Sequence, residues 1–149
     1  MRYVIFGESH GPAIGVVLEG VPAGLELDLE RVSDEMARRA PGGSPLSTAR
    51  KEADVPEILS GLFEGRTTGT PLCAVIANTD TRSRDYATLK DLPRPGHGDY
   101  AGHVRYPGCN EYRGGGHFSG RRNAPLVFVG AGAKSPLAHR GATGHSRSS

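Results

Sequence analysis

The chain has 149 residues, of which 36% are hydrophobic and 23% charged, and its formal net charge is +2 with histidine neutral. This length is typical of a single domain. No apolar run approaches the roughly 18 residues of a membrane helix, so we expect no membrane-spanning segment. The weak net charge does not by itself favour a polyanionic partner.

The N-terminal and cysteine patterns favour a cytoplasmic protein. The apolar stretch before Gly7 is too short for the core of a signal peptide, and the acidic Glu8 follows at once. Cys73 and Cys109 lie far apart, and neither belongs to a C-x-x-C pair. We therefore expect two free thiols rather than a disulfide.

Hydrophobic periodicity predicts the first regular elements. Residues 13–19 have the pattern of a mostly buried strand. Asp28 can cap a helix that runs to about Ala40 and ends at Pro41. Apolar residues recur in it at helical spacing. These residues are Leu29, Val32 and Met36.

The middle of the chain alternates strand and turn signals. Residues 55–63 are predicted to form strand pieces, with a short helix as the alternative, because Pro56 and Gly61 disfavour a helix. Residues 65–71 are predicted to form a turn. Residues 72–77 give the clearest signal of a buried strand.

The second half is rich in glycine, proline, arginine and tyrosine. We expect residues 78–120 to form a long loop, and a loop of that length is uncommon unless it is functional or disordered. Its tyrosines argue against plain disorder. Residues 124–134 are predicted to begin a helix or a strand. The tail after Lys134 loses apolar periodicity and is expected to be unstructured.

His10 lies between glycines in the segment 7–12, where a strand is expected to meet a turn. Such a position lets an imidazole and bare backbone approach a ligand closely. The unperturbed pKa of histidine, about 6.5, suits proton donation near neutrality. The alternative is a histidine that is hydrogen-bonded inside a tight turn.

Two further segments carry groups suited to an anion or a proton. Cations with interleaved hydroxyls at residues 38–51 can clamp a phosphate or carboxylate, and the alternative is a solvated helix end. His97 precedes Asp99 by two residues and can transfer a proton from an ordered loop, or be merely structural. With His103 these residues lack a convincing metal-ligand spacing, so no metal is expected.

Three glycines, Gly114 to Gly116, are followed by His117, Phe118 and Ser119. Bare backbone of this kind can hold a phosphate or a flat ring. The spacing matches neither the dinucleotide fingerprint nor a Walker loop. Alone, this glycine run is a weak signal.

Taken together and in this order, these motifs resemble the chorismate synthase family from about Arg2 to about Lys134. The matching segments are residues 7–11, 38–42, 50–52, 58–61, 63–71, 78–80, 94–97, 112–116 and 119–121. The resemblance implies an α+β fold, a chorismate-synthase-like β-α-β sandwich. Residues 1–134 would be its N-terminal part and residues 135–149 a disordered or aberrant tail.

The resemblance also implies an activity and its ligands. The family uses reduced FMN to catalyse the 1,4-anti elimination of phosphate from 5-enolpyruvylshikimate 3-phosphate, giving chorismate for aromatic amino acid biosynthesis by the shikimate pathway. The implied small-molecule substrate carries a phosphate and two carboxylates. Neither nucleic acid nor membrane is an implied partner. The family is typically a homotetramer.

Individual roles follow from the resemblance position by position. His10 would lie near the leaving phosphate and His97 near the reduced flavin, as the two catalytic residues. The substrate-binding or NADP-binding residues would be Ser9, Arg39 and Arg50, with NADPH as an alternative ligand of Arg39 and as a reductant. The flavin would touch His117, Phe118 and Ser119. We expect the rings of His10 and His97 to face one cavity.

Departures from the family pattern leave other functions open. Pro45 replaces a residue that is basic or polar in many relatives, and the family's chain is more than twice as long. An Arg-Ser-Asp motif from its later half has no counterpart here. The alternatives are an inactive fragment of that enzyme, marginally folded on its own, and a Gly/Arg-rich module that binds single-stranded nucleic acid.

Overall fold

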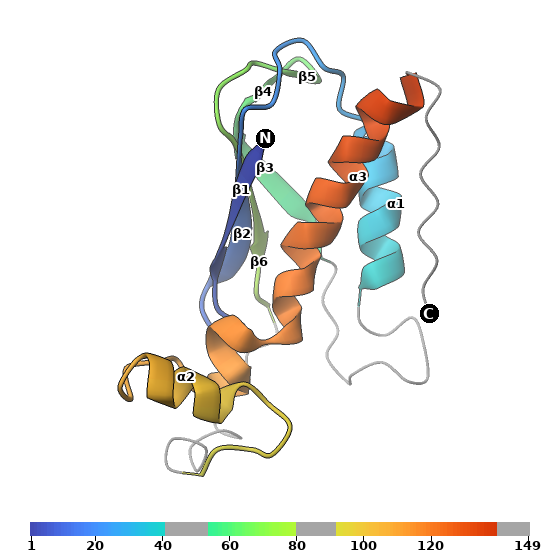
Figure 1. Ribbon diagram of the computed structural model, residues 1–149. Helices are drawn as coiled ribbons and strands as arrows, with labels where there is room; N and C mark the ends of the chain where they lie inside the picture. The colour runs from blue at the N-terminus through green and yellow to red at the C-terminus, as the bar shows by residue number, and fades with distance from the viewer. Residues whose placement is uncertain (41–53, 80–91, 140–149) are drawn as a thin grey trace.

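The computed structural model describes residues 1–40, 54–79 and 92–139 of the chain, with side chains up to residue 134. One layer is a four-stranded antiparallel sheet of order β1-β2-β6-β3 (Figure 1). Its strands are β1 (Arg2–Gly7), β2 (Ala13–Glu19), β3 (Pro56–Ser60) and β6 (Leu72–Ala77). A small second sheet pairs β4 (Leu62–Phe63) with β5 (Arg66–Thr67).

The register of the sheet places its apolar side chains on one face. Ile14 of β2 pairs with Ile76 of β6, and Leu18 pairs with Leu72. Because side chains alternate along a strand, these residues point to the same side. All four are at most 6% exposed, so this face forms the core.

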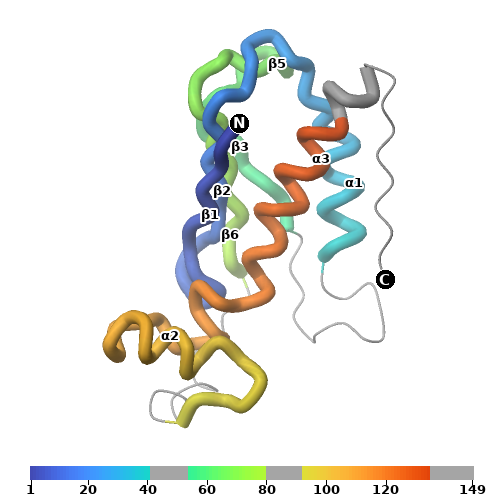
Figure 2. Tube along the Cα trace, in the orientation of Figure 1, coloured from blue at the N-terminus to red at the C-terminus, as the bar shows by residue number. Residues whose placement is uncertain are grey.

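Two helices form the second layer and cover that face (Figure 2). The helix α3 (Asn123–His139) contacts β2 and β6, and α1 (Leu29–Arg39) packs on α3. Phe128 of α3 and Val32 and Met36 of α1 are at most 2% exposed. Burial of these side chains joins the sheet and both helices into one core.

Helix α1 has an N-cap and an ion pair to α3. The Asp28 carboxylate accepts a hydrogen bond from the amide of Arg31 at 2.9 Å, as an N-cap does. Farther along, Glu35 pairs with Lys134 of α3 at 2.9 Å. The hydrogen bond from Lys134 holds the pKa of Glu35 below its usual range. The ion pair links the two helices at the edge of the core.

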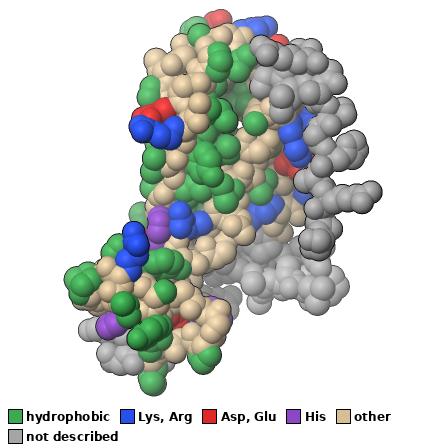
Figure 3. Space-filling model, in the orientation of Figure 1, with side chains coloured by type: hydrophobic (Ala, Val, Ile, Leu, Met, Phe, Trp, Pro, Cys, Tyr) green, Lys and Arg blue, Asp and Glu red, His purple; other side chains and the backbone are tan. Residues whose placement is uncertain are grey.

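A projection extends beyond the lower end of the sheet in Figure 1. It contains α2 (Asp99–Arg105), η2 (Arg113–Phe118) and η3 (Gly120–Arg122). Exposed apolar side chains gather on it (Figure 3). Among them are Tyr100, Val104, Tyr106 and Phe118.

The structure confirms the α+β class and most of the predicted elements. The strands at 13–19 and 72–77 and the helix capped by Asp28 are present, and residues 124–134 belong to a helix. Both thiols are free, with Cys73 half-buried and Cys109 exposed. Leu29 is 48% exposed, although its spacing placed it with the buried residues of α1.

Three predicted boundaries are wrong. Residues 66–67 of the predicted turn form β5, because that segment pairs with β4. Residues 99–105 and 113–118 of the predicted long loop form α2 and η2, and η3 begins at its last residue, Gly120. These segments are held by contacts rather than by apolar periodicity. Helix α3 continues past Lys134 to His139, and the rest of the tail lies outside the described residues. In addition, no range was predicted for strand β1 from the sequence.

Within the described parts of the chain, every helix is too short or too polar to span a bilayer.

Replacing Phe128 with alanine is expected to lower the free energy of unfolding by about 3–5 kcal/mol, because the ring is almost fully buried between the layers. The matched control on the same helix is Leu126→Ala, at a side chain 40% exposed, with an expected change of about 0.5 kcal/mol. Urea unfolding followed by circular dichroism measures both changes. Equal losses for the two variants would contradict the two-layer packing.

Candidate active site

Loops and helix ends from both layers meet at the lower end of the sheet in Figure 1. Strands β1 and β6 end there, α1 ends there, and α3 begins there. The connection between β1 and β2 carries Ser9 and His10. This end of the molecule therefore collects side chains from segments far apart in the sequence.

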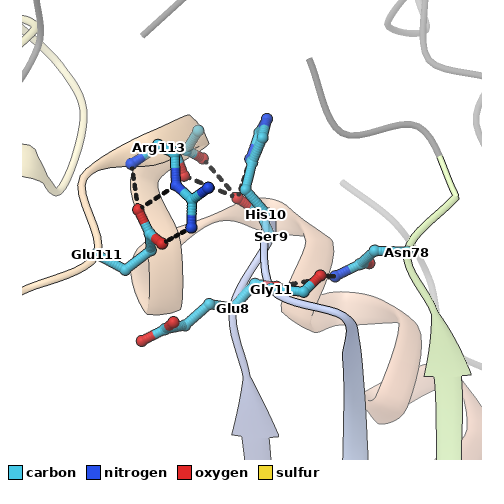
Figure 4. A network of polar contacts seen from close by, with 8 residues as sticks. Glu8, Ser9, His10, Gly11, Asn78, Glu111 and Arg113 are labelled. Atoms are coloured by element: carbon cyan, nitrogen blue, oxygen red, sulfur yellow. Dashed lines mark hydrogen bonds and ion pairs between the residues drawn. The ribbon is translucent and has the colours of Figure 1, made fainter. Parts of the chain in front are cut away.

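The loop that carries His10 is anchored by Ser9, which is 1% exposed. The Ser9 hydroxyl lies 3.2 Å from the carbonyl oxygens of Arg113 and Gly114, and 3.0 Å from Nδ1 of His10 (Figure 4). The Ser9 amide also donates to Gly116 O at 3.3 Å. The fold therefore brings the His10 loop and the distant glycine run into direct contact.

These distances allow one tautomer of His10 in particular. When the single hydroxyl proton of Ser9 points to the carbonyl of Arg113 or Gly114, the serine oxygen can accept Nδ1–H of His10. In that tautomer Nε2 is the ring atom that can exchange a proton.

The glycine run admits no side chain at its contact with this loop. Gly114, Gly115 and Gly116 have φ values of 59°, 84° and 51°, which glycine adopts without strain. A Cβ on Gly114 would lie 2.3 Å from Cε1 of His10, and one on Gly116 would lie 2.0 Å from Glu111 O. Both the conformation and the close packing therefore require glycine.

An ion pair between Glu111 and Arg113 lies beside His10 (Figure 4). Arg113 Nε donates to Glu111 Oε1 at 2.8 Å. The hydrogen bond from Arg113 lowers the pKa of Glu111, and the charge of His10 adds to that effect. The same pair raises the pKa of Arg113, with a smaller contribution from Glu8. His10 therefore has a permanently charged pair as its neighbour.

A cleft of about 510 Å³ opens next to the glycine run. Its walls include His117 and Phe118 of η2, Arg105 and Tyr106 at the end of α2, and Glu8. His117 Nδ1 lies 3.2 Å from Gly7 O, which fixes the ring against β1. The rings of Tyr106 and Phe118 are 6.2 Å apart. The volume and the aromatic walls suit a planar ligand.

The turn that carries His97 contacts the glycine run from another direction. Arg94 donates through Nε to Asp99 at 2.8 Å, and a Cβ on Gly115 would lie 3.7 Å from Arg94 Nη2 and 3.9 Å from Asp99 Oδ1. The hydrogen bond from Arg94 lowers the pKa of Asp99. His97 itself is exposed, with Nδ1 3.2 Å from Pro95 O.

That His10 and His97 face one cavity stays a prediction. Their two loops meet neighbouring glycines, Gly114 and Gly115. The residues that line this cleft include His117 but neither of these two histidines.

The remaining candidates lie around this centre. Arg39 pairs with the buried carboxylate of Asp54. Ser119 accepts a hydrogen bond from the Arg121 amide at 3.3 Å. Phe118 packs against Gly98, the N-cap of α2. A Cβ on Gly98 would lie 2.6 Å from the Cβ of Phe118. Arg50 lies outside the described residues.

Sequence reasoning missed three residues of this region. Asp54 stood alone in a polar segment, and Glu111 had no recognisable partner in the sequence. Asn78 was part of a matched motif but had no assigned role. Asp54 pairs with Arg121 and Asn78 with the His10 loop, and both partners are distant in the chain. Glu111 pairs with Arg113, two residues further on.

The fold and this site define an α+β protein with a histidine loop against a glycine run, beside a cleft lined by two aromatic rings. The chain belongs to the chorismate synthase family, whose sequence profile matches residues 1–147. It is 52% identical over 143 residues to the chorismate synthase of Desulfovibrio desulfuricans, and 53% identical over 140 residues to that of Aeropyrum pernix.

Those alignments cover 96% and 94% of this chain but only 39% and 37% of the two relatives. A crystal structure of a chorismate synthase superposes with a TM-score of 0.63 at 31% identity. That match covers 94% of this chain and 34% of the crystallised one. The chain therefore spans less than two fifths of the length of each of these proteins.

Replacing Gly114 with alanine is expected to displace the His10 ring, because the new methyl group would overlap it. The positive φ adds a cost of about 1–2 kcal/mol. The control is Gly120→Ala, where a Cβ would meet nothing within 4 Å. Histidine ring NMR spectra and urea unfolding measure both effects. Unchanged His10 resonances in a folded Gly114→Ala protein would contradict the contact.

Replacing Arg94 with glutamine is expected to raise the pKa of Asp99, because its main hydrogen-bond donor is removed. A carboxyl with a lowered folded pKa stabilises the fold above about pH 3.9, and that stability is lost as the pH falls through the folded value. The variant should therefore be less stable at pH 6 by about 1 kcal/mol, with a smaller further loss below pH 4. Urea unfolding between pH 2.5 and 7 measures this.

The control for Arg94 is Arg2→Gln. Arg2 pairs with Glu19 at the surface, where the side chains are 77% and 48% exposed. Such a pair contributes little, so the stability profile should stay close to that of the unchanged chain. An Arg94→Gln profile that matches the control would show that Asp99 is not held by Arg94.

Proposed function

We propose that this chain forms the part of a chorismate synthase active site that carries His10. The reaction is the 1,4-anti elimination of phosphate from 5-enolpyruvylshikimate 3-phosphate to give chorismate, a lyase step of the shikimate pathway. The observation that carries the proposal is the Ser9–His10 loop on the glycine run, where Nε2 of His10 can exchange a proton. Membership of the family supports the choice of reaction.

His10 acts as the proton donor to the leaving phosphate. Protonation of a leaving oxygen lowers its charge and eases bond cleavage. With Nδ1–H held by Ser9, the proton that moves is the one on Nε2. Ser9 thereby orients the ring and also lies beside the bound phosphate. Arg39 and Arg50 bind the anionic groups of the substrate, with Arg39 alternatively serving NADPH.

Reduced FMN fits the cleft beside the glycine run. The walls offer the aromatic faces of Tyr106 and Phe118 to a ring system and the guanidinium of Arg105 to a phosphate. When bound, the flavin would lend electron density to the reacting system and take it back, so the reaction would be redox-neutral. His117, which lines the cleft, and Ser119 would hold the flavin, and His97 of the neighbouring turn would tune its protonation.

Residues 1–134 form the N-terminal part of a chorismate synthase domain in this proposal. The part of the relatives that the chain does not cover supplies the remaining flavin contacts and the base that removes the substrate proton. The chain alone is therefore expected to bind ligands without turnover at ordinary enzyme rates. The complete enzyme would be cytoplasmic and homotetrameric.

A chimera tests the activity. The chain replaces the matching segment of the Desulfovibrio desulfuricans relative, to which it is 52% identical. The chimera should release phosphate and form chorismate when reduced FMN and 5-enolpyruvylshikimate 3-phosphate are supplied without oxygen. His10→Ala in the chimera should lower kcat about 10²- to 10⁴-fold, the usual contribution of a general acid.

The matched control for that chimera is His103→Ala. His103 is an exposed histidine of α2 that does not line the cleft. Its loss should leave kcat within about twofold. A folded chimera that binds FMN but is equally active with and without His10 would overturn the assignment of the proton donor.

A further inference from the structure

Asp54 is a buried carboxylate that holds two arginines. Its side chain is fully buried, and its φ of 48° is uncommon for a residue other than glycine. Oδ2 accepts from Nη1 of Arg39, and Oδ1 accepts from Nη1 of Arg121. A buried charge requires such partners, so Asp54 fixes the end of α1 relative to the start of α3.

Arg121 passes this constraint to the end of β6. Its side chain is 4% exposed. Nε donates to Asn78 Oδ1 at 3.1 Å, and Nη2 approaches Ala77 O at 3.4 Å. Since a guanidinium only donates, the atom of Asn78 that faces it must be the amide oxygen. Arg121 thus determines which way the Asn78 amide points.

The other side of that amide closes the His10 loop. Nδ2 of Asn78 donates to Glu8 O at 2.9 Å and to Gly11 O at 2.8 Å (Figure 4). These carbonyls flank Ser9 and His10 on both sides. Both Nδ2 protons are used, and the Asn78 backbone amide also donates to Pro12 O at 3.0 Å. The loop is therefore clamped from the side opposite the glycine run.

We propose that Asn78, oriented by Arg121 and Asp54, is a positioning residue that sets the orientation of His10. Asn78 acts through the loop backbone and touches neither substrate nor cofactor. The functional consequence rests on the proposed role of His10, whereas the placement of the ring does not. Because Asp54 also holds Arg39, one buried network orients a proton donor and an anion-binding cation together.

The variant that isolates this role is Asn78→Asp. Aspartate keeps the size and still accepts from Arg121, but it has no proton for Glu8 O or Gly11 O. The His10 ring is then free to change its contact with Ser9 and its distance from Glu111 and Arg113, the charged pair beside it. We expect the His10 pKa to move by about half a unit or more.

Ring NMR of the full chain as a function of pH measures that shift, with His103 as an internal reference. The matched control is Glu35→Gln, which removes the ion pair between α1 and α3 far from the loop. It should lower stability and leave the titration of His10 unchanged. A purely structural role for Asn78 predicts the same behaviour from both variants, and that result would overturn the proposal.

If the Asn78→Asp variant does not fold, a measurement on the unchanged chain still tests the clamp. Both side-chain amide protons of Asn78 should exchange with deuterium at least about tenfold more slowly than those of Asn123, which is exposed at the start of α3. Equal exchange at the two residues would show that the clamp does not form, and the proposal would then fall.

The chimera separates this inference from the proposed function. If positioning and function both hold, Asn78→Asp lowers kcat about tenfold or more while KM changes little, and the pH optimum moves with His10. If the chimera is inactive but the His10 titration still shifts, the positioning role stands and the proposed reaction falls. An active chimera in which Asn78→Asp changes neither kcat nor the titration removes the positioning role.

Discussion

There is no room for a side chain between the Ser9–His10 loop and the glycine run at residues 114–116. A Cβ on Gly114 would overlap the His10 ring, and the backbone there has positive φ at three successive residues. This close approach brings the Ser9 hydroxyl within reach of two carbonyls and of Nδ1 of His10. The glycines are therefore a condition for the chemistry that we assign to the imidazole, and the cleft beside His117 depends on the same contact.

The opposite side of the loop depends on burial of charge. Asp54, Arg121 and Asn78 belong to different segments, and Arg121 joins the other two. The side chains of Asp54 and Arg121 are at most 4% exposed. Unpaired groups of this kind are costly to bury, so the network forms as a unit or not at all. In the chain, Arg121 lies in η3 immediately before α3, Asn78 directly follows β6, and Asp54 binds Arg39 at the end of α1. The packing of the two layers and the placement of the site residues thus depend on the same buried network.

The sequence predicted elements whose signals are local. Strands β2 and β6 and helix α1 carry apolar periodicity, and Asp28 gives a cap. Helices α2, η2 and η3 were not predicted because their glycine-rich segments have no local helix signal. Contacts with Phe118 and with the Arg94–Asp99 pair hold them instead. Ser9, His10 and His117 were identified through their motifs; the structure places Ser9 against His10, and His117 against Gly7 of the same segment. Asp54 was missed because an isolated acid has no signal until its distant arginine is adjacent in space. Glu111 was missed although Arg113 is only two residues away, because a charged pair of that spacing is common on a solvated surface.

The central claim concerns where the leaving phosphate binds. A crystal structure of the active chimera with oxidised FMN and 5-enolpyruvylshikimate 3-phosphate tests it most directly. Our account predicts a phosphate oxygen within hydrogen-bond distance, about 3 Å, of Nε2 of His10, with Nδ1 still on Ser9. A phosphate held elsewhere, with His10 farther away than one bridging water, would contradict the account.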